Sequence, residues 1–132
     1  MTNEEMLRLL TAAYTGPGSA AEGTFAGDVL RACADEKRIN LILTTGGTGL
    51  SPRDVTPEAT ADVLEREIRA IRVAMWVEGL RITPNAMLSR AVAGTRGSSL
   101  IVNLPGSEKA ARENLAAVLG ALEHALHMIA AE

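Results

Sequence analysis

A glycine-rich turn that directly follows a short apolar run constrains the fold of this chain more than any other feature. The run Asn40–Leu43 is short and rich in branched residues, as is typical of a strand buried on both faces. The turn Thr44–Gly49 is followed by a helix start, with Thr56 as the N-cap and Pro57 as the first helical residue. A strand, a glycine turn and a helix in this order predict an α/β fold with an anion-binding loop at the end of a parallel strand.

The composition of this turn favours a ligand-binding loop over a tight turn without a ligand. No Gly-Lys-Ser/Thr follows it, and its glycine spacing is not that of a dinucleotide-binding fingerprint. Three glycines nevertheless let the backbone come close to a ligand, because no Cβ stands in the way. A valine at Gly47 should therefore block the ligand. We expect phosphate to be bound by backbone N–H groups and hydroxyls of Thr45, Gly46, Gly47, Thr48 and Gly49.

A second segment of the same kind lies near the end of the chain, where another strand opens onto a helix that Ser107 should cap. Lys109 in the first turn of that helix is unfavourable to the helix dipole, which favours an anion-binding role over that of a solvated lysine. The expected binding residues here are Asn103, Pro105, Gly106, Ser107 and Lys109. Two anion sites at two strand ends suit a ligand set with more than one phosphate.

Five polar residues near these loops have both a binding and a structural explanation. Asp54 either serves the site or has a structural role, as a partner of its neighbour Arg53 or as a cap near Thr56. Glu58 is explained equally well as an ordinary acid in the first turn of a helix. Ser89 and Arg90 follow a short turn, and arginine suits a bidentate phosphate contact, although an arginine that pins a loop is a common alternative.

Periodicity predicts the remaining elements of the second half of the chain. Apolar residues at helical spacing predict one helix over Pro57–Trp76 and a short turn from Pro84 that Thr83 caps. Strands at 92–95 and 99–104 should be joined by a hairpin-type turn. The last helix should present an apolar face formed by Leu115, Val118, Leu119, Leu122, Leu126 and Ile129.

Four segments of the chain, in this order and spacing, resemble the MogA/MoaB family of molybdenum cofactor biosynthesis proteins, which includes the N-terminal domain of gephyrin-type proteins. They are Thr44–Gly49 with Arg53–Glu58, Ile82–Arg90, Ala93–Gly97 and Ile101–Ser107. The resemblance covers about residues 36–129. It implies a three-layer αβα sandwich with a mostly parallel sheet.

The resemblance also implies an activity, the adenylylation of molybdopterin by Mg·ATP with release of pyrophosphate. In that scheme the two loops hold phosphates, and Asp54 is catalytic and holds Mg²⁺ against them. Ser89 and Arg90 would help to bind the pterin or its phosphate. ATP and molybdopterin are the implied substrates and Mg²⁺ the implied cofactor.

The implied assembly is a homotrimer, with other cofactor-biosynthesis proteins as further partners. Ile71, Met75 and Trp76, together with the strand near Val92, are candidates for subunit contact, and packing in the core of one subunit is the alternative. A short chain gains from association because small domains bury a smaller fraction of their surface.

The resemblance does not extend to residues 1–39, which we interpret as an atypical helical segment of a single domain over residues 1–132. Helices are predicted at residues 3–13 and from Thr24 through Cys33, so the N-terminal half of the family's sheet should be reduced. A Pro-Asp segment that carries a catalytic acid in the family has no counterpart here. The alternative function is therefore a non-catalytic molybdopterin-binding or assembly protein, and a third is a shortened form of an ordinary enzyme.

Composition excludes several other classes of function. The net charge is −3 and lysines and arginines do not cluster, so nucleic acid is not an expected partner. The start of the chain lacks the pattern of a signal peptide, and no apolar run approaches the ~20 residues of a membrane span. Cys33 is the only cysteine and is expected to be a buried filler, which fits a cytoplasmic protein. His124 and His127 have a spacing that metals can use, but no cysteine and no acid beyond Glu123 clusters around them, so helix packing or a surface role is expected.

Overall fold

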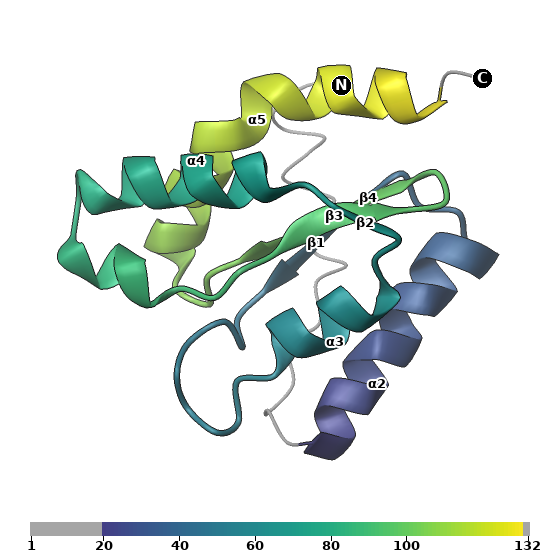
Figure 1. The fold of residues 1–132 in the computed structure, drawn as a ribbon, viewed down its shortest axis with the longest axis horizontal. Helices are drawn as coiled ribbons and strands as arrows, with labels where there is room; N and C mark the ends of the chain where they lie inside the picture. The colour runs from purple at the N-terminus through teal and green to yellow at the C-terminus, as the bar shows by residue number, and fades with distance from the viewer. Residues whose placement is uncertain (1–19, 131–132) are drawn as a thin grey trace.

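The computed structural model describes residues 20–130, and the helix predicted at residues 3–13 lies outside them. The described chain forms three layers, with a central sheet between two pairs of helices (Figure 1). Helices α4 (Arg69–Leu80) and α5 (Glu108–Ala130) cover one face, and α2 (Ala20–Arg31) and α3 (Thr56–Val63) cover the other. The predicted αβα sandwich is confirmed.

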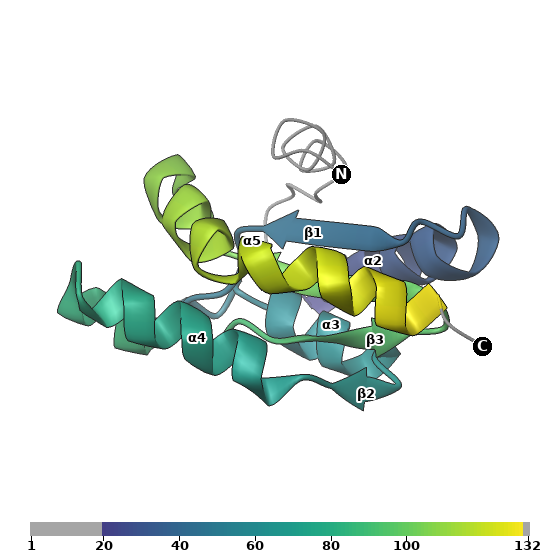
Figure 2. The ribbon, with the colours of Figure 1, turned by 90° about the horizontal axis from the view of Figure 1, so that it is seen from above.

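The sheet contains β1 (Leu41–Thr45), β2 (Arg66–Glu67), β3 (Ala93–Arg96) and β4 (Ser99–Leu104), in the order β1-β4-β3-β2. β1 and β4 are parallel neighbours, with Leu41 opposite Leu100. β3 runs antiparallel to both β4 and β2, so three of the four strands point the same way. β1 and β2 form the edges (Figure 2).

The N-terminal part is helical, as predicted, but the helix begins earlier than the sequence suggested. α2 already contains Ala20, so Thr24 lies inside the helix and does not cap it. Ala20 and Ala21 are strong helix formers and extend the helix through the position where a cap was expected. Between residue 20 and β1 the chain forms α2 and a π-helical turn, η2 (Ala32–Glu36), without a strand. The sheet is reduced on this side in the described residues.

The single helix predicted over Pro57–Trp76 is wrong, because the chain forms α3, the short strand β2 and then α4. Leu64 adopts an extended conformation with ψ 136°, which ends α3. Backbone N–H groups of Glu65 and Ile68 then donate to carbonyls of β3 at 2.8 Å. Edge pairing with β3 therefore overrides the helical spacing of the apolar residues.

The apolar residues at helical spacing predicted one helix wrongly, because they pack on opposite faces of the sheet. Leu64 packs beside α2, whereas Ile68 and Met75 pack beneath α5. Within β1 the same alternation places Leu41 and Leu43 on the α5 side and Ile42 on the α2 side. Each face has its own apolar cluster, and both clusters share the central strand β4.

The C-terminal elements agree with the predictions. Thr83 caps the 3₁₀ helix η3 (Pro84–Leu88), since its Oγ1 accepts a hydrogen bond from the Asn85 N–H at 3.2 Å. Ser107 caps α5 in the same way, because its Oγ accepts from the Ala110 N–H at 3.3 Å. The apolar face of α5 is confirmed, with Leu115, Val118 and Leu122 buried and Leu119, Leu126 and Ile129 packed against the same cluster.

Three further sequence predictions concern burial. Cys33 is a free, buried cysteine that packs in the α2 cluster, as expected. Met75 and Val92 are 2% and 9% exposed, so core packing accounts for both of these candidate subunit contacts. His124 and His127 are exposed on α5. Of the helices within residues 20–130, none combines the length and the hydropathy needed to cross a bilayer.

Candidate functional site

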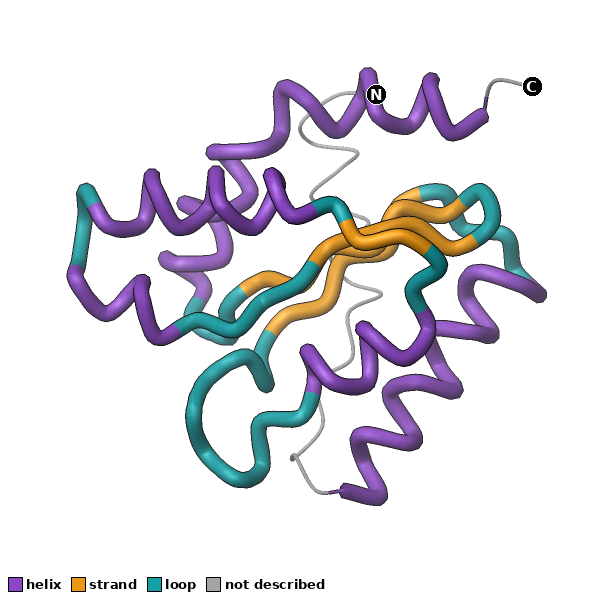
Figure 3. Tube along the Cα trace, viewed as in Figure 1, coloured by secondary structure: helices purple, strands orange, loops and turns teal. Residues whose placement is uncertain are grey.

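The glycine-rich loop leaves β1 at the end of the sheet where η3 also lies (Figure 3). Gly46 and Gly47 have positive φ angles of 87° and 70°, which turn the chain back towards α3. A Cβ on Gly47 would lie 2.1 Å from the Thr56 Oγ1, and the Thr56 N–H donates to the Gly47 carbonyl at 3.2 Å. A side chain at Gly47 would thus collide with α3. A valine at this position should therefore distort the loop itself, and would not simply block a ligand as the sequence suggested.

The same contact corrects the predicted cap of α3. Val55 holds the N-cap position without a side-chain hydrogen bond, and Thr56 is the first helical residue. Thr56 is buried against the glycine turn. Its role is to hold the loop to the helix and not to cap the helix.

The two predicted anion-binding loops adjoin, because they follow neighbouring parallel strands. The Gly46 N–H donates to the Leu104 carbonyl at 2.9 Å. A Cβ on Gly106 would lie 3.2 Å from the Gly46 Cα, so the two backbones are in close contact. Their N–H groups and the start of α5 are therefore brought to one end of the sheet.

Arg90 pins the glycine-rich loop, which is the structural alternative considered for it. Its Nε donates to the Gly49 carbonyl at 2.8 Å, and its Nη2 donates to the Asp54 carbonyl at 2.6 Å. Its Nη1 bonds both carboxylate oxygens of Glu58, at 2.7 and 2.9 Å. The hydrogen bond to Glu58 raises the pKa of Arg90 above its usual value. Arg90 and Glu58 thus hold the loop in shape.

One structural alternative for Asp54 was a pair with Arg53, and the two side chains do not form this pair. The Asp54 Oδ2 accepts a hydrogen bond from the Ser51 N–H at 3.0 Å and closes a tight turn in the loop. Arg53 is exposed and makes no ion pair with any described residue. The half-buried carboxylate of Asp54 keeps its Oδ1 for another partner, since no described group bonds it.

Asn103 was predicted to bind a ligand, but its side chain is fully buried beneath the loops. Its Oδ1 accepts from the Val92 N–H at 3.1 Å, and its Nδ2 donates to the hydroxyls of Thr44 and Thr60 at 2.8 and 3.0 Å. These bonds tie β4 to β1, α3 and the chain before β3. Asn103 therefore supports the site from below and cannot contact a ligand with its amide.

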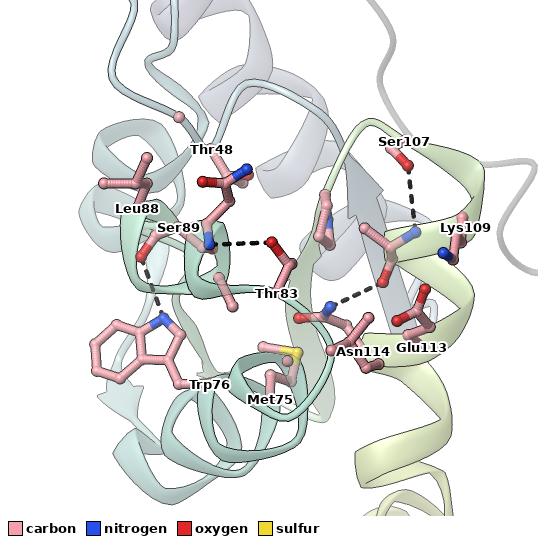
Figure 4. Close-up of a pocket in the computed structure, with 17 residues that line it drawn as sticks. Thr48, Met75, Trp76, Thr83, Leu88, Ser89, Ser107, Lys109, Glu113 and Asn114 are labelled. Atoms are coloured by element: carbon pink, nitrogen blue, oxygen red, sulfur yellow. Dashed lines mark hydrogen bonds between the residues drawn. The ribbon is translucent and has the colours of Figure 1, made fainter.

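A pocket of about 440 Å³ lies between the glycine-rich loop, η3, α4 and the start of α5 (Figure 4). The predicted residues that line it are Thr48, Gly49, Ser89, Pro105, Ser107 and Lys109. The predicted residues outside its lining are Thr45, Gly46, Gly47, Arg53, Asp54, Glu58, Arg90, Asn103 and Gly106. Most members of the second group shape or support the loops that form the pocket.

The pocket also contains residues that the sequence did not indicate. Trp76 lines one wall, where its indole N–H donates to the Ser89 carbonyl at 3.2 Å and the guanidinium of Arg72 lies 5.2 Å from its ring centre. Asn85 lies at the start of η3, and Glu113 and Asn114 lie in the second turn of α5. Glu113 and Asn114 could have been predicted from the sequence, because they lie about one helical turn after Lys109 on the same helix.

Two charged residues in the pocket have no partner within residues 20–130. Lys109 and Glu113 make no hydrogen bond or ion pair with any described residue. Lys109 lies beside Ser107 at the positive N-terminal end of α5. This end of the pocket is thus suited to an anion.

The described residues also limit how a metal ion could be held. Histidine, cysteine and carboxylate side chains do not form any cluster of three or more in residues 20–130. Asp54 supplies one carboxylate beside the loops, and Mg²⁺ is commonly held by one or two carboxylates with substrate phosphates and water. The donor set fits Mg²⁺ bound together with a nucleotide.

A three-layer fold with two adjoining glycine-containing loops at the ends of parallel strands defines an α/β domain with a candidate anion-binding site at one end of its sheet. The family model described as "Probable molybdopterin binding domain" matches residues 22–124, and the chain belongs to this family. The family resemblance inferred from the sequence is thus confirmed.

Known relatives agree with this assignment. Gephyrin of Dictyostelium discoideum is 56% identical over 92 residues, which are 70% of this chain and 13% of that protein. The molybdopterin adenylyltransferase of Helicobacter pylori strain 26695 is 44% identical over 95 residues, which are 72% of this chain and 54% of that protein. The crystal structure of the molybdopterin biosynthesis enzyme MoaB from Thermus thermophilus superposes with a TM-score of 0.77 at 55% identity, over 81% of this chain and 67% of that one. The chain spans about half of the bacterial adenylyltransferase.

Proposed function

We propose that this chain acts in molybdenum cofactor biosynthesis by binding molybdopterin and adenylylating it with ATP. The observation that carries the proposal is the meeting of two glycine-containing loops and the unpaired Lys109 at one pocket, at the ends of two parallel strands. Relatives named molybdopterin adenylyltransferase support the reaction.

Phosphate groups would be bound where the pocket is lined by backbone and cationic groups. Thr48 and Gly49 supply loop backbone and a hydroxyl, and Ser107 and Lys109 supply the positive start of α5. In the reaction, a terminal phosphate oxygen of molybdopterin attacks the α-phosphorus of ATP. The bond from that phosphorus to the bridging oxygen of the β-phosphate breaks, and pyrophosphate leaves.

The protein needs no nucleophile for this reaction, because positioning and charge stabilisation supply most of the catalysis. Asp54 is the residue that would hold Mg²⁺, with phosphate oxygens as the other ligands. A bound Mg²⁺ would neutralise charge on the phosphates. Arg90 and Glu58 fix the loop that carries Asp54, and Asn103 fixes the strands beneath it.

The substitution Asp54→Asn tests the catalytic role. Asparagine keeps an oxygen that can accept from the Ser51 N–H, so folding should change little while the charge is lost. We expect pyrophosphate release from Mg·ATP and molybdopterin to fall by at least a hundredfold, with little change in melting temperature. Asp62→Asn, an exposed acid of α3, is the matched control. Full turnover in Asp54→Asn would contradict the role.

A second candidate is a protein that binds molybdopterin without transferring the adenylyl group. The observation in its favour is that neither Asp28 nor Asp35 supplies a second acid beside Asp54, since Asp28 pairs with Arg31 and Asp35 with Arg96. Neither acid reaches Asp54 among the described contacts. Tight molybdopterin binding without pyrophosphate release by the unmodified chain would favour this candidate over the enzyme.

The expected homotrimer also belongs to this proposal, and so does a cytoplasmic location. Support comes from α4, whose outer face exposes Val73, Val77 and Leu80 by 47%, 48% and 45%. These residues recur at helical spacing and form a more suitable contact than the buried Met75. Light scattering at micromolar concentration checks the assembly, and a mass near 13.9 kDa that persists on concentrating would contradict it.

A further inference from the structure

The pocket has two unlike walls. Met75, Trp76 and Leu88 give the side formed by α4 and η3 a largely apolar surface, with Thr83, Asn85 and Ser89 as its polar members (Figure 4). The side formed by α5 contributes Lys109, Glu113 and Asn114. Such a space suits a flat ring that stacks on one wall and directs polar groups at the other. The polar wall should therefore decide which ring is accepted.

Of the described residues that line the pocket, Glu113 is the only one with a carboxylate. Its side chain is half-buried and has no hydrogen-bonding or ion-pair partner in the described chain. Glu108, one turn and a little earlier on the same helix, is by contrast exposed and paired with Arg112 at 3.1 Å. A half-buried carboxylate without a protein partner keeps both oxygens for other donors, so Glu113 is placed to accept hydrogen bonds from a ligand.

We infer that Glu113 recognises the amino edge of the pterin ring and so selects pterin over adenine. This inference rests on the proposed function. A pterin presents two adjacent donors, the 2-amino group and the ring N3–H, which match the two oxygens of a carboxylate. Adenine presents one amino group flanked by ring nitrogens that accept hydrogen bonds, and these would repel the carboxylate.

The positions of the two unpaired charges also orient the ligand. Lys109 and Glu113 are four residues apart on α5, which is a rise of about 6 Å along the helix. Helical side chains lean towards the N-terminus, so Lys109 reaches towards Ser107 and the loops. The phosphate of molybdopterin thus lies at the loops and its pterin lies at the second turn of α5.

The test compares two ring systems in two carboxylate variants. Isothermal titration calorimetry would measure the binding of 6-hydroxymethylpterin phosphate and of the matching lumazine phosphate, in which an oxo group replaces the 2-amino group. The unmodified chain should bind the pterin at least tenfold more tightly, because the oxo group opposes the carboxylate. Glu113→Gln should lose most of this preference, while ATP affinity stays within twofold. Glu108→Gln is the control and should keep the preference.

Several results would overturn the inference. If Glu113→Gln keeps the full preference for pterin in a protein that still binds it, another group reads the ring, and the proposed function stands. If Glu113→Gln weakens ATP and leaves pterin unchanged, the carboxylate faces the nucleotide. If the unmodified chain binds neither the pterin phosphate nor molybdopterin, the proposed function itself fails. Circular dichroism melting confirms that each variant is folded.

Discussion

The two ends of the sheet are each held by an arginine, and they differ in what lies beside it. Arg90 bonds the Glu58 carboxylate and two loop carbonyls, and Arg96 bonds the Asp35 carboxylate and the Val63 carbonyl. In both cases the carboxylate raises the pKa of the arginine. At the Arg90 end, however, the pocket adjoins the two glycine-containing loops and the N-terminal end of α5, where Lys109 has no partner among the described residues. The pocket beside Arg96 also contains a cation without a described partner, Arg66, but it is lined by β2, the β3–β4 hairpin and the end of α5.

The difference shows which feature marks a binding site in this fold. An arginine that binds a carboxylate and a backbone carbonyl is found at both ends of the sheet and is satisfied by the protein itself at both. A cation that lines a pocket beside glycine-containing loops and the positive end of a helix is instead suited to an anionic ligand. The comparison can be tested by matched substitutions at the two ends.

The largest effect is expected from alanine at two glycines with positive φ. At Gly47 (φ 70°) a Cβ would lie 2.1 Å from the Thr56 Oγ1, whereas at Gly97 (φ 56°) no atom lies within 4 Å. Gly97→Ala should cost about 1 kcal/mol, from backbone strain alone. Gly47→Ala adds overpacking and should cost roughly 3 kcal/mol or more. Urea unfolding measures both.

Equal losses at the two glycines would contradict the crowded packing of the loop against α3. A normal stability for Gly47→Ala would mean that the loop relaxes away from Thr56 without cost. Either result would weaken the distinction between a shaped loop at one end and an open hairpin at the other.

The pair of glycine loops and the caps Thr83 and Ser107 could be predicted from the sequence because each depends on a few adjacent residues, whereas the three layers were predicted through the family resemblance. Prediction from the sequence failed where distant contacts decide. The helix predicted across Leu64 is broken because that segment pairs with β3, which is remote in the chain. Thr24 failed as a cap because the preceding alanines extend the helix.

The site was predicted in part for the same reason. The loop residues Thr48, Gly49, Ser107 and Lys109 could be found from local pattern, and they line the pocket. The sequence does not reveal that Asn103 faces inward, since its three hydrogen-bonding partners come from other segments. Glu113 was missed because a polar residue on a long helix resembles any solvated one.

The second expected effect concerns the two arginines and ligand affinity. Arg90→Ala removes bonds to Gly49 and Asp54, so the loop should loosen and affinity for ATP should fall at least tenfold. Arg96→Ala acts at the far end and should lower the melting temperature while affinity stays within twofold. Calorimetric titration of both variants makes the comparison, and equal losses of affinity would show that the two ends are coupled.

A smaller effect is expected from the removal of a single unpaired positive charge. Lys109→Met should weaken the binding of molybdopterin or ATP roughly fivefold, and added salt should weaken binding less in the variant than in the unmodified chain. Lys37→Met, at an exposed position before β1, is the matched control and should bind normally. An unchanged affinity and salt response in Lys109→Met would remove this lysine from the site.

The smallest expected effect is a pH dependence of the free energy of unfolding that arises from Asp35 and Arg96, at the end of the sheet away from the pocket. The hydrogen bond from Arg96 holds the pKa of Asp35 below its ordinary value of 3.8 in the folded chain. The ionised carboxylate therefore favours folding, and its contribution is complete above the unfolded pKa and is lost as the pH falls through the folded pKa.

The stability difference between the unmodified chain and Asp35→Asn should be constant above about pH 5 and should shrink below about pH 4. Because Asp35 is exposed, the difference should be small, and urea unfolding over this pH range measures it. A difference that grows towards acid pH would mean that the Asp35 carboxylate does not stabilise this end of the sheet.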